Sequence, residues 1–317
     1  MKNVYFIFIL LPLLLQGQNI VIEEIDLKNG QISIPGTLSY PKTKQKVPLL
    51  IFVHGSGNVD RNGNQGGLAK ANYIAQLSDS LTKNGIALYR YDKRTSNTNN
   101  FKFLKNISLT DFVDDVSKVI AHFKNDNRFK SIHLIGHSQG SLVAMLAADD
   151  NIKSYISLAG PSNTIDSVIS KQLTEQNEGL GKIAKEHFAE LAKTDTILSV
   201  NPMLLSIFAP QNQKFFKSWM SISPTSEIKK INKPILIIQG EKDLQINTAD
   251  ANNLLNAITE NSSVLEHNAE LILIDNMNHV LKEIEKQEEN LKSYTSPNFP
   301  LSSELVNAIT TFILRNE

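Results

Sequence analysis

The chain has 317 residues, which is enough for one large domain with an insertion or for two small domains. Its charge is balanced, with 32 Lys plus Arg against 32 Asp plus Glu, and this gives no electrostatic reason to expect nucleic acid or an anionic membrane as a partner. The sequence contains no Cys, which excludes disulfides, thiolate metal sites and a cysteine nucleophile.

The N-terminus has the features of a secretory signal peptide. Lys2 is followed by the apolar run Val4 to Leu15 and then by polar residues. At about a dozen residues, the run is shorter than the roughly 20 needed to span a bilayer as a helix. We therefore predict a signal peptide at residues 1–17 and export of the mature chain, residues 18–317, to the periplasm or the medium, with no stable membrane span in it. An uncleaved anchor is the alternative.

The mature chain opens with a predicted hairpin, because Val21–Leu27 and Gln31–Tyr40 flank an Asn-Gly turn signal at Asn29. Helices are predicted from about Leu68 to Asn84, from a cap at Thr110 onward, and from about Ser302 to Arg315. Short apolar runs predict the other strands, at Val47–Val53, Ile86–Tyr91, Ser131–Ile135, Tyr155–Ala159, Ile235–Gln239 and Leu271–Ile274. This alternation indicates an α/β fold with a mostly parallel central sheet and helices on both faces.

Residues 161–230 contain no convincing strand. We predict a helical cap insertion there, over the strand ends where open α/β sheets bind their ligands. Four of its aromatic residues are candidates for an acyl pocket, namely Phe208, Phe215, Phe216 and Trp219. The alternative is that they build the insertion's own core. No charged cluster interrupts them, which favours an apolar acyl or aryl group.

The segment Gly136-His137-Ser138-Gln139-Gly140 lies between a predicted strand and a helix-like stretch. This strand, turn and helix order is typical of a nucleophile elbow, with Ser138 as the nucleophile. A serine hydroxyl is a poor nucleophile at neutral pH, so an imidazole must take its proton and a carboxylate must orient that imidazole.

Asp243 and His279 are the candidates for the carboxylate and the imidazole. Each follows a predicted strand, so both are expected at the same edge of the sheet as Ser138. The chain order Ser, Asp, His is the one expected on this scaffold. Other nearby carboxylates are alternatives for the acid, namely Glu241, Asp250 and Asp275.

Four motifs together resemble the α/β-hydrolase superfamily: His54-Gly55-Ser56-Gly57, the elbow, Gly240-Glu241-Lys242-Asp243 and Asn278-His279. The pairing of HGSGNVDRN at residues 54–62 with Tyr91-Asp92-Lys93-Arg94 resembles a branch of bacterial secreted carboxylesterases with serine aminopeptidase-like and dienelactone hydrolase-like relatives. Dienelactone hydrolases proper use a Cys nucleophile, which this chain lacks.

The resemblance implies a serine hydrolase that cleaves small-molecule esters with small to medium acyl or aryl groups. Ser138 would be the nucleophile, His279 the general base and then acid, and Asp243 its orienting partner. The backbone N–H groups of Ser56 and Gln139 would form the oxyanion hole. Neither a metal nor an organic cofactor is implied.

Two alternatives come from other functional classes. An exported serine aminopeptidase or amidase of the same fold would need an acidic patch or carbonyl acceptors to hold a substrate amino terminus. The insertion offers four candidate residues for this patch, Glu175, Glu178, Glu186 and Glu190. The second alternative is a non-catalytic binding module, against which the complete Ser, Asp and His set argues.

Overall fold

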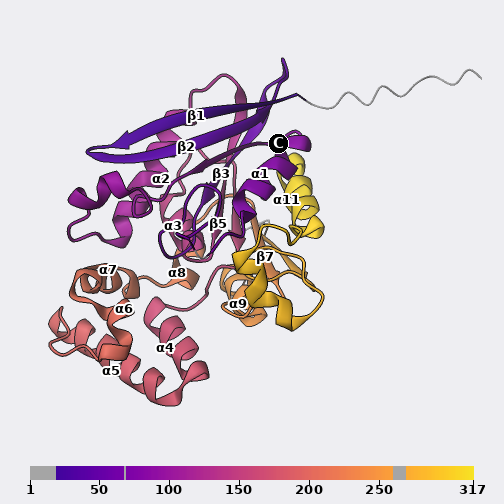
Figure 1. Cartoon of the computed structure of the whole chain (residues 1–317). Coiled ribbons are helices and arrows are strands. Elements are labelled where there is room, and N and C mark those ends of the chain that lie inside the picture. Colours follow the sequence, from indigo (N-terminus) through magenta and orange to yellow (C-terminus); the bar gives the residue numbers. More distant parts are fainter. Residues whose placement is uncertain (1–18, 68, 260–268) are drawn as a thin grey trace, which may run out of the picture.

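A computed structural model of the chain describes residues 19–67, 69–259 and 269–317 (Figure 1). The signal peptide predicted at residues 1–17 lies outside these ranges. Within them, no helix is both long enough and apolar enough to cross a membrane.

The described residues form one sheet. Its strands are β1 (Ile20–Asn29), β2 (Ile32–Pro41), β3 (Val47–Val53), β4 (Ala87–Tyr91), β5 (Phe129–His137), β6 (Ser154–Leu158), β7 (Ile235–Gly240) and β8 (Ala269–Ile274). The eight strands lie in the order β1-β2-β4-β3-β5-β6-β7-β8. Only β2 pairs antiparallel with its neighbours β1 and β4, and the remaining pairs are parallel. The predicted hairpin and the mostly parallel sheet are therefore confirmed.

Helices cover both faces of this sheet (Figure 1). On one face, Leu50 and Phe52 of β3 share a buried cluster with α1 (Tyr73–Lys83) and α11 (Ser303–Arg315). On the other, Leu49 and Ile51 share a second cluster with α2 (Leu109–Phe123), α3 (Gln139–Ala147) and α9 (Thr248–Thr259). Successive strand side chains point to opposite faces, so an apolar run such as β3 requires this double cover.

Two helices begin at other residues than the sequence predicts. The first begins at Tyr73 instead of Leu68, because Asn72 adopts a left-handed φ of 52° and its backbone N–H donates to the Asn64 side chain at 3.0 Å. The cap of α2 is Ser108 instead of Thr110. Ser108 forms a capping box with Asp111, whose carboxylate accepts the Ser108 N–H at 2.8 Å.

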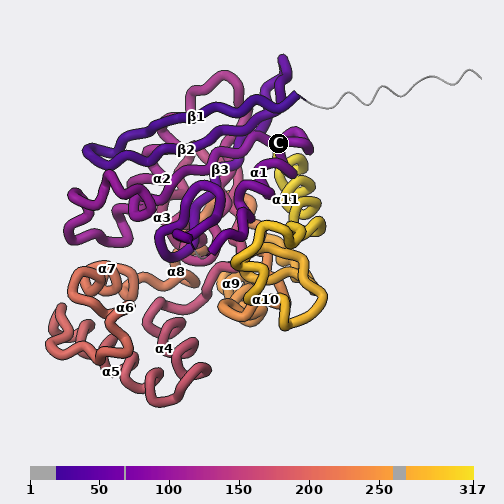
Figure 2. The backbone as a smooth tube through the Cα atoms, in the orientation of Figure 1, coloured from indigo at the N-terminus to yellow at the C-terminus, as the bar shows by residue number. Residues whose placement is uncertain are grey.

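Residues 161–230 contain helices and no strand, and we call this segment the cap. It contains α4 (Ile165–Gln176), α5 (Glu178–Thr194), a 3-10 turn (Pro202–Leu204), α6 (Leu205–Phe208), α7 (Pro210–Met220) and α8 (Pro224–Ile228). Figures 1 and 2 show α4 to α7 as a layer beside the sheet and its helices, away from α1 and α11. The cap contacts the body at α2, where the Leu109 N–H donates to the Ser218 hydroxyl at 2.9 Å.

Three short elements complete the described chain. They are the 3-10 turns Thr98–Phe103 and Gln287–Glu289 and the helix α10 (Asn290–Thr295). Asn290 of α10 donates to the carbonyl of Lys242, so this segment braces the loop after β7. That loop carries Asp243.

Candidate active site

Ser138 lies at the turn between β5 and α3, with φ 55° and ψ −122°. A side-chain-bearing residue adopts such a conformation at a cost of about 1–3 kcal/mol, so the surroundings must hold it there. Backbone hydrogen bonds do so on both sides of the turn. The Ser138 N–H donates to the Leu158 carbonyl at 2.9 Å, and the Ser138 carbonyl accepts from the Ser141 N–H at 3.0 Å.

The two glycines of the motif are required by close backbone contacts. A Cβ on Gly136 would lie 2.2 Å from the Gly140 carbonyl oxygen, and a Cβ on Gly140 would lie 2.2 Å from the Val53 carbonyl oxygen. Neither neighbour is a flexible side chain that can move away. Both positions therefore require glycine for packing reasons, and the close contacts that the glycines permit form the strand, turn and helix geometry expected of the elbow.

Asp243 and His279 come together at the same edge of the sheet. His279 Nδ1 lies 2.7 Å from Asp243 Oδ2, and both side chains are almost completely buried. The Gln239 amide donates to the same carboxylate oxygen at 3.0 Å. The other oxygen accepts the backbone N–H groups of Gln245 at 2.7 Å and Ile246 at 3.0 Å.

These contacts keep Asp243 ionised. Burial alone would raise the pKa of this carboxyl, but His279 and the two backbone donors outweigh that effect and hold the pKa below its usual range. An ionised carboxylate can only accept a hydrogen bond, so His279 Nδ1 carries the proton and donates it to Asp243. The remaining ring nitrogen, Nε2, is then a proton acceptor.

His137 positions the backbone of His279. Its Nε2 lies 2.8 Å from the His279 carbonyl oxygen, and since a carbonyl only accepts, Nε2 carries the proton. Its Nδ1 then faces the Tyr73 hydroxyl at 3.4 Å. Burial lowers the pKa of His137 to about 3, so the ring stays neutral, which suits a supporting role and not a proton transfer.

Ser138 and His279 line one small cavity of about 90 Å³, together with Gly55 and Tyr294. Among the described residues, the Ser138 hydroxyl makes no hydrogen bond. In enzymes that use a serine nucleophile and a histidine base, the hydrogen bond between the two is often long without substrate and tightens when substrate binds. Glu241, Asp250 and Asp275 are not hydrogen-bonded to His279, so Asp243 is the carboxylate that the fold brings to it.

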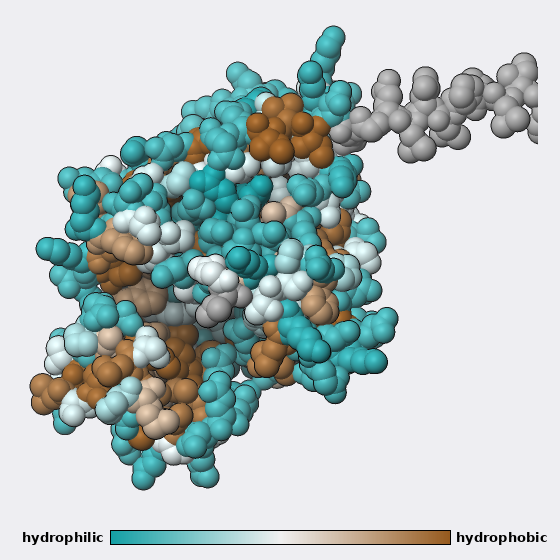
Figure 3. All heavy atoms as spheres, viewed as in Figure 1, coloured by the Kyte–Doolittle hydropathy of each residue, from teal (hydrophilic) through white to brown (hydrophobic). Residues whose placement is uncertain are grey.

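Ser138, Ser56 and Gln139 also line a second cavity, of about 840 Å³. The cap supplies its apolar wall, with α4 contributing Ile165, Val168, Ile169 and Leu173 and α7 contributing Phe215, Phe216 and Trp219. Figure 3 shows apolar side chains gathered over the cap. The residues of α4 are missing from the sequence prediction, although the apolar spacing of this helix carries the signal.

The prediction that Phe208 lines the acyl pocket is wrong. Its side chain is fully buried and does not line the cavity of Ser138. It packs instead inside the cap, with its ring centroid 4.7 Å from that of Phe188 and 5.2 Å from that of His187. The core interpretation therefore holds for Phe208, while Phe215, Phe216 and Trp219 reach the cavity.

Lys93 is a residue of this site that sequence reasoning missed. Its side chain borders the large cavity and is the one charged group among the described residues that line it. The ammonium donates to the Gly55 carbonyl at 2.7 Å and to the Gln139 side-chain oxygen at 2.7 Å. Burial lowers the pKa of Lys93 to about 7.

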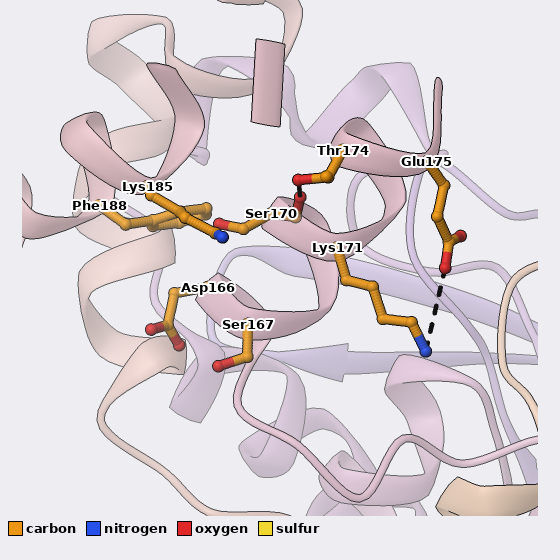
Figure 4. Close-up of a pocket in the computed structure, with 8 residues that line it drawn as sticks. All are labelled: Asp166, Ser167, Ser170, Lys171, Thr174, Glu175, Lys185 and Phe188. Atoms are coloured by element: carbon orange, nitrogen blue, oxygen red, sulfur yellow. Dashed lines mark hydrogen bonds and ion pairs between the residues drawn. The ribbon is translucent and has the colours of Figure 1, made fainter. Parts of the chain in front are cut away.

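Figure 4 shows a further pocket on the cap, between α4 and α5. It contains Glu175, which pairs with Lys171 at 4.0 Å, and it contains none of the predicted catalytic residues. The acidic residues proposed for a peptidase, Glu175, Glu178, Glu186 and Glu190, do not line the cavity of Ser138. Over the described ranges, no group of three or more His, Asp or Glu side chains is placed to hold a metal ion.

The chain is similar to a known protein family and to a curated esterase. A family model described as BD-FAE matches residues 38–258. The curated protein Esterase EstD of Thermotoga maritima is 24% identical over 268 residues, covering 82% of this chain. The aligned region is 60% of EstD, so the chain spans less than two thirds of that relative's length.

Solved structures agree on the fold. Est1E from Butyrivibrio proteoclasticus, in a structure with ferulic acid bound, has a TM-score of 0.58 and 20% identity, covering 90% of this chain and 96% of Est1E. The acylaminoacyl peptidase of Pyrococcus horikoshii has a TM-score of 0.57 and 15% identity, covering 94% of this chain and 42% of the peptidase. These likenesses confirm the predicted α/β-hydrolase fold, and the fold alone.

Proposed function

The chain belongs to the BD-FAE family, and from this premise we propose that it is a carboxylesterase acting through Ser138, His279 and Asp243. One observation carries the proposal. His279 is held by Asp243 at 2.7 Å in the small cavity that it shares with the strained Ser138. Ser138 also borders the cap-lined cavity of about 840 Å³. The proposed nucleophile therefore lies next to both the proposed base and a cavity that can hold the substrate.

The proposed reaction has two halves. His279 Nε2 takes the proton of Ser138 as its oxygen attacks the ester carbonyl, and the N–H groups of Ser56 and Gln139 stabilise the oxyanion. The intermediate then expels the alcohol, which receives the proton from His279 and leaves an acyl-enzyme. Water, activated by the same imidazole, releases the acid and restores Ser138.

The chemistry of the cavity supports esters with an apolar acyl or aryl group. Aliphatic side chains of α4 and the rings of Phe215, Phe216 and Trp219 form one wall. The volume of about 840 Å³ is that of a site for a drug-sized ligand. The name of EstD supports ester hydrolysis in general, and the ferulic acid bound to Est1E supports an aryl group.

A peptidase or amidase activity is the alternative on this fold. It would need carboxylates or carbonyl acceptors near Ser138 to hold a substrate ammonium, and among the described residues that line the large cavity the charged one is a cation, Lys93. This sign of charge favours the esterase. The predicted leader at residues 1–17 supports the further proposal that the enzyme acts outside the cytoplasm.

Hydrolysis of a panel of p-nitrophenyl esters, from short to long acyl chains, beside aminoacyl p-nitroanilides tests this function. We expect ester turnover by the mature chain, and a loss of roughly 10³- to 10⁶-fold in Ser138→Ala with an unchanged circular dichroism spectrum. Ester turnover that survives in Ser138→Ala would remove this serine from the mechanism. Turnover of the anilides alone would establish the peptidase instead.

A further inference from the structure

Lys93 lies two residues after the end of β4, is only 6% exposed, and lines the large cavity. Its ammonium lies 4.8 Å from the centre of the Phe112 ring, and no carboxylate of the described chain forms an ion pair with it. The next residue, Arg94, differs sharply. Arg94 pairs with Asp111 at 2.8 Å and Asp115 at 2.7 Å, so its charge is compensated in the resting protein.

The two acceptors of Lys93 belong to the two predicted halves of the oxyanion hole. The Gly55 carbonyl and the Ser56 N–H are opposite ends of one planar, conjugated peptide group. Lys93 donates to its carbonyl end at 2.7 Å. The other acceptor is the side chain of Gln139, the residue whose backbone N–H begins α3 beside Ser138.

A cation on a peptide carbonyl polarises the whole peptide group. Hydrogen bonds in such a chain strengthen one another, by about 10–30% per bond, and low local dielectric increases the electrostatic effect. The N–H of Ser56 therefore becomes a stronger donor toward negative charge. The same bonds tie the Gly55–Ser56 peptide to Gln139 and limit reorganisation when that charge forms.

We propose that Lys93 is a positioning residue of the oxyanion hole, which fixes and polarises the Gly55–Ser56 peptide and ties it to Gln139. The inference rests on the proposed esterase function. Burying a cation without a counter-charge is costly in the resting enzyme. Because the oxyanion supplies the missing negative charge only as the ester is attacked, the interaction stabilises the transition state more than the ground state.

The lowered pKa of Lys93 agrees with this role. Because burial brings it to about 7, the amine and the ammonium coexist near neutral pH. A negative charge forming at Ser138 favours the ammonium. The strongest polarisation of the peptide therefore coincides with the step that needs it.

The test compares Lys93→Met with Lys102→Met. Lys102 is a matched control, since it also lies 4.8 Å from a phenylalanine ring, that of Phe103, but it is exposed and lines no part of the cavity. We expect kcat of Lys93→Met on p-nitrophenyl butyrate to fall about 10- to 100-fold, less than the roughly 10²- to 10³-fold effect of removing a direct donor. KM is expected to stay within about twofold of the unsubstituted enzyme. Lys102→Met should change neither constant.

A boronic acid separates this role from a structural one, because it forms a tetrahedral anion on the catalytic serine. We expect the inhibition constant of butylboronic acid to rise in Lys93→Met by the same factor as kcat falls. A rise in KM with unchanged kcat, or a lower kcat with unchanged boronate affinity, would overturn the proposal. Wild-type activity in Lys93→Met would also overturn it and leave the esterase function intact, whereas no ester turnover by the unsubstituted enzyme would defeat the proposed function first.

A chemical rescue covers the case in which Lys93→Met does not fold. The natural sequence has no Cys, so Lys93→Cys introduces a single thiol that can be alkylated in the unfolded chain before refolding. 2-Bromoethylamine restores an ammonium at the length of lysine, and 2-bromoethanol gives a neutral side chain of the same length. We expect only the aminoethylated protein to recover kcat. Equal recovery in both, or folding in the charged form alone, would assign Lys93 to stability and refute the proposal.

Discussion

Asp243→Asn is the substitution that most directly tests the arrangement of His279. The carboxylate of Asp243 accepts four hydrogen bonds, two at each oxygen. Oδ1 accepts from the backbone N–H groups of Gln245 and Ile246. Oδ2 accepts from Gln239 and from His279 Nδ1.

An asparagine amide cannot replace this carboxylate, because it has one acceptor oxygen. Backbone N–H groups cannot lose their hydrogens, so we expect the oxygen of Asn to stay with Gln245 and Ile246. The NH₂ group then faces His279 Nδ1 and can only donate to it. His279 must accept at Nδ1 and carry its proton on Nε2, where it can no longer accept the proton of Ser138.

The expected loss is large. A tautomer change of this kind costs about 10⁴-fold in kcat, which is about 5.4 kcal/mol of transition-state stabilisation. The measurement is kcat/KM on p-nitrophenyl butyrate, with circular dichroism to check the fold. Asp275→Asn is the matched control, since Asp275 is exposed in the loop after β8 and we expect full activity. More than a tenth of the activity in Asp243→Asn, or an equal loss in Asp275→Asn, would refute the reasoning.

Two further predictions concern packing. Phe208→Ala should lower the free energy of unfolding in urea by about 3–5 kcal/mol without changing the preferred acyl length. Phe215→Ala should admit longer acyl chains and lower the free energy of unfolding by less. The opposite pattern would show that Phe208 lines the acyl pocket. Gly140→Ala should destabilise the protein by at least the roughly 3 kcal/mol of severe overpacking, because the added Cβ meets the Val53 carbonyl at 2.2 Å. Gly67→Ala, with nothing within 4 Å of its Cβ, is the control, and equal melting temperatures for both variants would contradict this account.

The sheet could be predicted from the sequence because its strands carry a strong local signal. A parallel strand covered on both faces must be apolar along its whole length, and β3 at Val47–Val53 has the predicted bounds. The signal for the hairpin is equally local, because the Asn-Gly pair marks the turn and Gly30 adopts the left-handed φ of 61° that the turn requires. The backbone at Ser138 follows from contacts that only Gly136 and Gly140 permit.

Helix starts were less predictable, because side chains distant from the apolar stripe decide them. The Asn64 and Asn72 side chains hydrogen-bond each other at 2.8 Å and hold the loop before α1 out of helical conformation. Apolar periodicity does not report such bonds. At α2, Ser108 and Thr110 are both good caps, and the partner Asp111 favours Ser108.

The cap shows why the cavity was predicted only in part. Phe208 ends α6 and Phe215 lies in α7, and the chain changes direction between them at Ala209, whose backbone is extended with ψ 145°. Periodicity assigns faces within one helix and not across such a break. Which ring reaches the cavity therefore depends on how two short helices pack.

The different surroundings of Lys93 and Arg94 could not be predicted from the sequence either. In the sequence they are two basic residues of one motif, and nothing local distinguishes them. The fold gives Arg94 two carboxylates of α2 and gives Lys93 two uncharged acceptors, the Gly55 carbonyl and the Gln139 amide. A compensated cation stabilises the resting structure, whereas an uncompensated one is ready to stabilise a negative charge that forms later. The position of Lys93 beside both predicted oxyanion donors makes that later charge the oxyanion at Ser138.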